Sequence, residues 1–83
     1  MTTLAELGIG QSGRIQTIDG DDSVTIRLLE MGLTPGAPVC VIGSSILGDP
    51  IEIEIRNYRL SVRKSEAARV VLEQSSDANS DAQ

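Results

Sequence analysis

The strongest constraint on the fold is the alternation of apolar and polar residues between positions 51 and 63. Residues 51–56 alternate isoleucine with charged side chains, and residues 59–63 alternate arginine or serine with leucine or valine. Successive side chains of a β-strand point to opposite faces, so each half is typical of a strand with one buried face. The pattern therefore predicts a β-hairpin, and the rest of the fold must cover its apolar face.

The turn of this hairpin is predicted at the Asn-Tyr pair at residues 57–58. Asparagine tolerates the positive φ that a two-residue hairpin turn requires. This turn keeps the apolar residues of both strands on one face. On the other face it places Glu52 opposite Arg63, which would form an oppositely charged cross-strand pair.

One segment has the periodicity of a helix. Val24, Leu28 and Met31 are spaced i, i+4 and i+7, which predicts a short helix over residues 22–31 with one apolar face. Gly32 stands where a helix C-terminus favours a residue with positive φ. So short a helix is marginal alone and must pack on a sheet.

The remaining elements are short. A helical turn capped by Ser65 is expected, with further strands at residues 14–18, 38–42 and 70–72. Together these predict a mainly β fold: a small closed or nearly closed β-barrel of about five strands with one short α-helix. We expect one domain over residues 1–73 and, because the composition turns polar there, a disordered tail over residues 74–83.

The composition excludes several kinds of site. The chain has no histidine, and Cys40 is its only cysteine, so His-based catalysis and Cys/His metal clusters are ruled out. The Gly-x-Gly-x-x-Gly match at residues 8–13 lacks the strand and helix of a dinucleotide site. The acidic run at residues 19–30 lacks the glycine that a calcium loop needs. We therefore predict no enzymatic activity, no cofactor and no metal site.

The charge and hydropathy of the chain limit its partners. The net charge of −5 and the single aromatic residue argue against nucleic acid as a partner. Apolar runs are far shorter than the ~20 residues that span a bilayer, so direct membrane insertion is not expected. The N-terminus has no signal-peptide pattern, which predicts a cytoplasmic protein.

A protein partner is the remaining expectation. Leu28 and Leu29 cannot both point inward, because helix neighbours lie about 100° apart, so Leu29 should lie at the edge or outside. The cations between Arg56 and Arg69 are interpreted as a solvated face, with an acidic protein surface as the alternative. The candidate partner-binding residues are Leu29, Glu30, Leu47, Gly48, Asp49 and Pro50.

Several segments in order carry a family pattern. They are Leu4-x-x-Leu-Gly, Gly13-Arg-Ile, Arg27-Leu-Leu-Glu-Met-Gly-Leu-Thr-Pro-Gly, Leu47-Gly-Asp-Pro-Ile-Glu-Ile and Tyr58-Arg-Leu-Ser-Val-Arg. The chain thereby resembles the FeoA family, the small cytoplasmic accessory proteins of bacterial ferrous iron uptake. The resemblance implies an SH3-like β-barrel that binds a cytoplasmic part of FeoB, the membrane iron permease with a GTPase domain, and biases its conformation.

Two alternatives remain open. The chain could be a transition-metal-binding sensor or carrier that holds Fe²⁺ through carboxylates, although this metal favours imidazole ligands that the chain lacks. It could also be a self-associating structural module, and a homodimer would be compatible with the accessory role.

Overall fold

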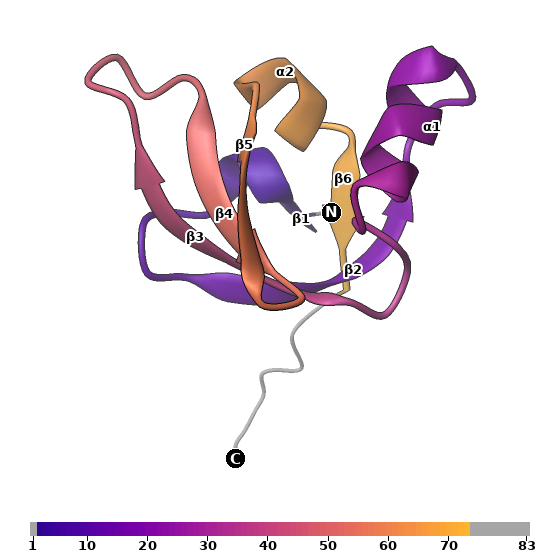
Figure 1. Cartoon of the computed structure of the whole chain (residues 1–83), viewed down its shortest axis with the longest axis horizontal. Helices are drawn as coiled ribbons and strands as arrows, with labels where there is room; N and C mark the ends of the chain where they lie inside the picture. Colours follow the sequence, from indigo (N-terminus) through magenta and orange to yellow (C-terminus); the bar gives the residue numbers. More distant parts are fainter. Residues whose placement is uncertain (1, 74–83) are drawn as a thin grey trace.

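Six antiparallel strands form one curled sheet in the computed structural model, which describes residues 2–73 (Figure 1). The strand order is β1-β6-β2-β3-β4-β5. The strands are β1 (Thr2–Thr3), β2 (Ser12–Ile18), β3 (Pro38–Ser44), β4 (Ile51–Ile55), β5 (Tyr58–Val62) and β6 (Val70–Leu72). The helices are the 3-10 turn η1 (Leu4–Glu6), α1 (Ser23–Glu30) and α2 (Lys64–Ala67). The predicted tail at residues 74–83 lies outside the described residues.

The mainly β architecture with one short helix of more than a single turn is confirmed. The hydrogen-bonded ladder ends at β1 and at β5, so the sheet is curled but does not close into a complete barrel. Strand β1 and the turn η1 were not predicted, because they are too short to show a period in the sequence. Among the described residues, no helix is long and apolar enough to cross a membrane.

Strands β4 and β5 form the predicted hairpin, but the turn lies one residue earlier than expected. Its two central residues are 56 and 57, with φ values of 52° and 76°. Glu52 therefore lies opposite Ser61, and the predicted pairing of Glu52 with Arg63 is wrong. The apolar face is nevertheless correct, because moving the register by two residues leaves every side chain on its original face.

Contacts with the end of α1 explain this turn. Arg56 donates from Nε to the Gly32 carbonyl over 3.3 Å and from Nη2 to Thr34 Oγ1 over 2.6 Å. The Tyr58 hydroxyl donates to the Met31 carbonyl. Tyr58 therefore begins β5, and Arg56 adopts the positive φ of a turn residue. These tertiary contacts offset the local cost of that conformation.

Helix α1 ends as the sequence predicted. Gly32 has a φ of 105°, its N–H donates to the Leu29 carbonyl over 3.0 Å, and the Leu33 N–H donates to the Leu28 carbonyl over 3.1 Å. This is the Schellman arrangement, which satisfies carbonyls at the helix end. It also turns the chain so that Leu33 is fully buried.

The core is aliphatic and draws side chains from every sheet strand except β1. Its fully buried members include Leu4, Ile15, Leu28, Leu33, Val39, Val41, Ile53, Ile55, Val62 and Val70. Leu28 is 0% exposed and Leu29 is 37% exposed, which confirms their predicted orientations. The second short helix differs from expectation, because it begins at Lys64 after an N-cap at Arg63 and not at Ser65.

The two neighbouring leucines should respond differently to truncation. Leu28→Ala should lower the free energy of unfolding by about 2–5 kcal/mol, because it leaves a cavity in the core. Leu29→Ala should change it by less than about 0.5 kcal/mol, because the side chain is partly solvated. Urea denaturation of both variants measures the difference, and equal losses would contradict this orientation of α1.

Candidate partner-binding surface

The six predicted partner-binding residues lie in two groups on either side of α2. Leu29 and Glu30 belong to α1, whereas residues 47–50 belong to the loop between β3 and β4. Figure 1 shows α2 between this loop and α1, all at the same end of the molecule. A partner that touches both groups must therefore lie across α2.

The α1 group is larger than the sequence analysis indicated. Ile26 is 54% exposed and precedes Leu29 by three residues, so both side chains lie on the outer face of the helix with Glu30. Ile26 was not predicted as a surface residue, because the helix was identified from the spacing of its buried face alone. The i, i+3 spacing of two apolar residues on the opposite face could have indicated it.

The loop group also contains an unexpected member. Ile46 is 101% exposed and Leu47 is 91% exposed, so the loop presents two large apolar side chains to water. The signal in the sequence was the Ile-Leu pair inside a segment rich in glycine and serine, whose small side chains offer little apolar surface to cover it.

Hydrogen bonds within the loop fix its shape. Ser45 Oγ donates to the Asp49 carbonyl over 2.6 Å and accepts from the Asp49 N–H over 3.2 Å. The Ser45 N–H donates to the Pro50 carbonyl, and the Gly48 N–H donates to the Ser45 carbonyl. These bonds fix the backbone of the loop, so the positions of its apolar residues are set before any partner arrives.

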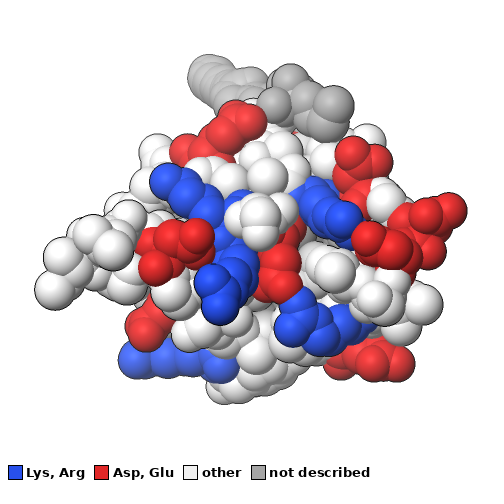
Figure 2. Space-filling view, turned by 90° about the horizontal axis from the view of Figure 1, so that it is seen from above, with Lys and Arg blue, Asp and Glu red and all other residues white. Residues whose placement is uncertain are grey.

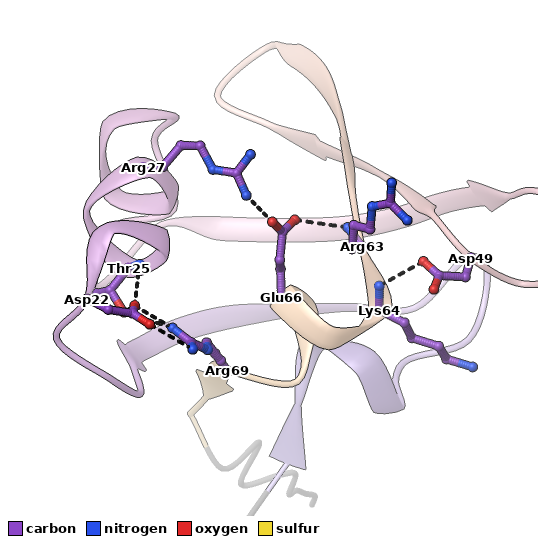
Figure 3. Close-up of polar contacts among 8 residues, drawn as sticks. All are labelled: Asp22, Thr25, Arg27, Asp49, Arg63, Lys64, Glu66 and Arg69. Carbon is purple, nitrogen blue, oxygen red and sulfur yellow. Dashed lines mark hydrogen bonds and ion pairs between the residues drawn. The ribbon is translucent and has the colours of Figure 1, made fainter.

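Asp49 has a structural role. Its Oδ1 accepts from the Lys64 N–H over 2.9 Å, at the first residue of α2 (Figure 3). An acceptor at this position satisfies one of the unpaired N–H groups of a helix start. The carboxylate of this predicted contact residue is therefore engaged within the chain, and it ties the loop to α2.

The other end of α2 is tied to α1. Glu66 Oε1 accepts from the Arg63 N–H over 3.0 Å, and its Oε2 pairs with Arg27 of α1 (Figure 3). Just after α2, Arg69 donates to both carboxylate oxygens of Asp22 over 2.6 and 3.0 Å. Four residues of helix thus set the position of both candidate groups.

The cations around the hairpin divide into two sets. Arg56 and Arg69 are engaged within the chain, as described above. Within residues 2–73, the side chains of Arg59, Arg63 and Lys64 form no ion pair. Figure 2 shows cations and carboxylates intermingled over the end of the molecule that carries α2, and not a surface of one sign. This favours specific local pairing over general attraction to a highly charged partner.

The Asp22–Arg69 pair also changes the titration of both groups. The hydrogen bonds from Arg69, followed by the one from the Thr25 N–H, hold the pKa of Asp22 far below its usual value of 3.8. The same contact raises the pKa of Arg69. Asp22 is the N-cap of α1, and its Oδ1 accepts from the Thr25 N–H over 3.2 Å. The carboxylate thus joins the start of α1 to the segment after α2.

The described residues hold no group of three or more histidine, cysteine or acidic side chains that could bind a metal ion. Cys40 is half-buried in β3. The exposed apolar side chains of the two groups lie on elements that are both hydrogen-bonded or ion-paired to α2.

Comparison with known proteins gives a consistent result. A family model described as the FeoA domain matches residues 2–74. A Fe(2+) transport protein A/Fe(2+) transporter FeoB fusion protein of Porphyromonas gingivalis is 35% identical over 70 residues, which are 84% of this chain and 8% of the fusion protein. The chain thus spans less than a tenth of that relative.

Two solved structures share the fold. FeoA of Stenotrophomonas maltophilia, described as an SH3 domain protein complexed with zinc, has a TM-score of 0.79 and 28% identity, covering 88% of this chain and 91% of that one. A FeoA-like protein from Clostridium acetobutylicum has a TM-score of 0.79 and 33% identity, covering 88% of each chain. The SH3-like fold implied by the resemblance is confirmed.

The Asp22–Arg69 pair should make the stability of the folded chain depend on pH in the acidic range. The pKa of Asp22 is lower in the folded chain, so the pair's contribution is present above about pH 4 and is lost as the pH falls further. Asp22→Asn should lower the melting temperature at about pH 7, and this difference should shrink below about pH 3. Thermal melts measure it, with Asp21→Asn as the control. A difference that stays constant with pH would contradict the prediction.

Proposed function

The chain belongs to the FeoA family, and from this premise we propose that it is a cytoplasmic accessory protein of ferrous iron uptake that binds the cytoplasmic part of a FeoB-type permease. The observation that carries the proposal is the fusion protein, in which a related segment and a Fe(2+) transporter FeoB form one chain. Fusion supplies a high effective concentration. A separate chain must obtain the same association from a binding surface.

The proposed action is binding without catalysis. The chain has no histidine, and residues 2–73 contain no cluster of metal ligands that could support hydrolysis or metal transfer. A bound protein shifts a permease between conformations only if it binds one of them more tightly. We therefore propose that this chain acts by differential affinity for the states of the permease.

The proposed contact surface comprises both candidate groups. We assign it Leu29 and Glu30 of α1 and residues 47–50 of the loop, and we add Ile26 and Ile46 because their side chains are exposed beside these residues. Asp49 would contribute by anchoring the loop through Lys64. Two apolar groups joined by a short helix suit a partner that lies across α2.

A second candidate function is binding of a transition metal. One observation favours it, namely that the Stenotrophomonas maltophilia FeoA structure is described as complexed with zinc. An anaerobic titration of this chain with Fe²⁺ and with Zn²⁺ would decide the matter. Micromolar or tighter binding by the isolated chain would favour the metal function, whereas affinities of only about 1 mM would reject it. Sedimentation over a range of concentrations tests the remaining alternative, a homodimer.

The α1 group can be tested by adding a charge. Leu29→Glu should weaken binding to the isolated cytoplasmic domain of the permease at least about tenfold, because a carboxylate would be buried against apolar contacts. Isothermal titration calorimetry gives the affinity, and circular dichroism confirms that the variant is folded. Gln16→Glu adds the same charge at an exposed position of β2 and should bind like the unmodified chain.

The outcomes separate two failures. A folded Leu29→Glu variant with undiminished affinity would remove α1 from the surface. No binding by the unmodified chain would reject the proposed function itself.

A further inference from the structure

A hollow of about 170 Å³ opens beside the loop between β3 and β4. Its apolar lining comes from three separate parts of the chain and includes Ala5, Leu7, Ile9, Val41 and Ile51. Gly48 lies at the side of the hollow next to the loop tip. The loop that presents Ile46 and Leu47 to water therefore also borders the hollow, through Gly48.

Three of the exposed large apolar side chains belong to segments that border the hollow. Ile9 is 66% exposed at the hollow, and Ile46 and Leu47 stand almost wholly in water next to Gly48. Of these three residues only Ile9 lines the hollow, whereas Ile46 and Leu47 belong to the loop whose Gly48 lines it. Single exposed apolar residues are common, but a hollow lined by apolar side chains next to them is a candidate contact site. The internal hydrogen bonds of the loop fix its backbone, so the wall of the hollow at Gly48 is already formed before an incoming group arrives.

One charged side chain lines the hollow, and it is Lys64. The Asp49 carboxylate accepts from the backbone N–H of Lys64 and not from its side chain (Figure 3). Within residues 2–73 its ammonium group forms no hydrogen bond or ion pair. An unpaired cation beside an apolar hollow favours a ligand with a carboxylate next to an apolar side chain.

We propose that this hollow is a docking site for a partner segment that inserts an apolar side chain between Ile9 and Gly48 and pairs an adjacent carboxylate with Lys64. The net charge of −5 makes the rest of this chain unfavourable for acidic segments, so the cation selects where such a segment binds. The inference deepens the proposed function, because it gives the chemistry of the permease segment that the loop group would contact.

A second copy of the chain fits this chemistry less well. The loop tip of another copy could supply Leu47 as the apolar side chain, but the nearest carboxylate, that of Asp49, is already engaged by the start of α2. Insertion of the tip would leave Lys64 without a partner. The site therefore favours a different protein over self-association.

The first experiment uses short peptide probes and the isotopically labelled full chain. Acetyl-Gly-Leu-Asp-Gly-amide should shift the amide signals of Ile9, Gly48 and Lys64 in a saturable way. Replacing the aspartate of the probe by asparagine should weaken binding about threefold, the size expected of an exposed ion pair. Replacing its leucine by serine should abolish binding. Equal binding of the aspartate and asparagine probes, or no saturable shift with any probe, would overturn the proposal.

Variants of the chain provide the matched controls. Lys64→Gln should remove the preference for aspartate over asparagine in the probe. Arg59→Gln removes a different unpaired cation from β5, outside the lining of the hollow, and should preserve the preference. Loss of the preference in both variants would show a general charge effect and overturn the assignment to Lys64.

A second experiment connects the hollow to the permease. If the unmodified chain binds the permease's cytoplasmic domain, Leu47→Ser and Lys64→Glu should each weaken that binding at least about tenfold. Undiminished affinity in both variants would overturn the inference but leave the proposed function standing. Binding of the peptide without binding of the permease domain would reject the proposed function but leave the hollow as a site for such segments. A dimer that dissociates on Leu47→Ser would identify a second copy as the occupant and overturn the proposal.

Discussion

The structure depends on the docking of a helix against a sheet that does not close. Helix α1 has eight residues, too few to be stable alone, and the sheet ends at an edge strand, β5. Each supplies what the other lacks. Leu28 and Leu33 enter the aliphatic core. The Met31 carbonyl at the end of α1 accepts from Tyr58 at the start of β5, and Arg27 of α1 pairs with Glu66 of α2, which follows β5. The helix and the edge strand therefore hold each other in place.

The short helix α2 connects α1 to the loop between β3 and β4. Its first N–H is bound by Asp49 of the loop, Glu66 pairs with α1, and Arg69 after it pairs with the start of α1. Individual surface ion pairs contribute little to stability. Their value here is geometric, because they fix the spacing between the exposed apolar residues of α1 and those of the loop. The proposed surface thus rests on polar contacts and not on the core.

Much of the fold could be predicted from the sequence, but less of the candidate partner-binding surface. The apolar face of the hairpin and the Schellman end of α1 followed from local patterns, because period and glycine position are local properties. The turn position did not, since contacts of Tyr58 and Arg56 with α1 determine it. The hollow could not be predicted either, because Leu7, Gly48 and Lys64 converge only through the tertiary fold. The exposure of Ile26 and Ile46 could have been predicted from the sequence, because both residues fall outside the apolar pattern of the core.

The bond from the hydroxyl of Tyr58 to the carbonyl of Met31 has an optical consequence. Tyr58 is the single aromatic residue of the chain, and there is no tryptophan. The near-ultraviolet aromatic absorption and the fluorescence of this protein therefore originate at the junction of hairpin and helix. Tryptophan absorbs at longer wavelengths than tyrosine, so long-wavelength excitation of a complex would report a tryptophan-containing companion alone, without attaching a dye.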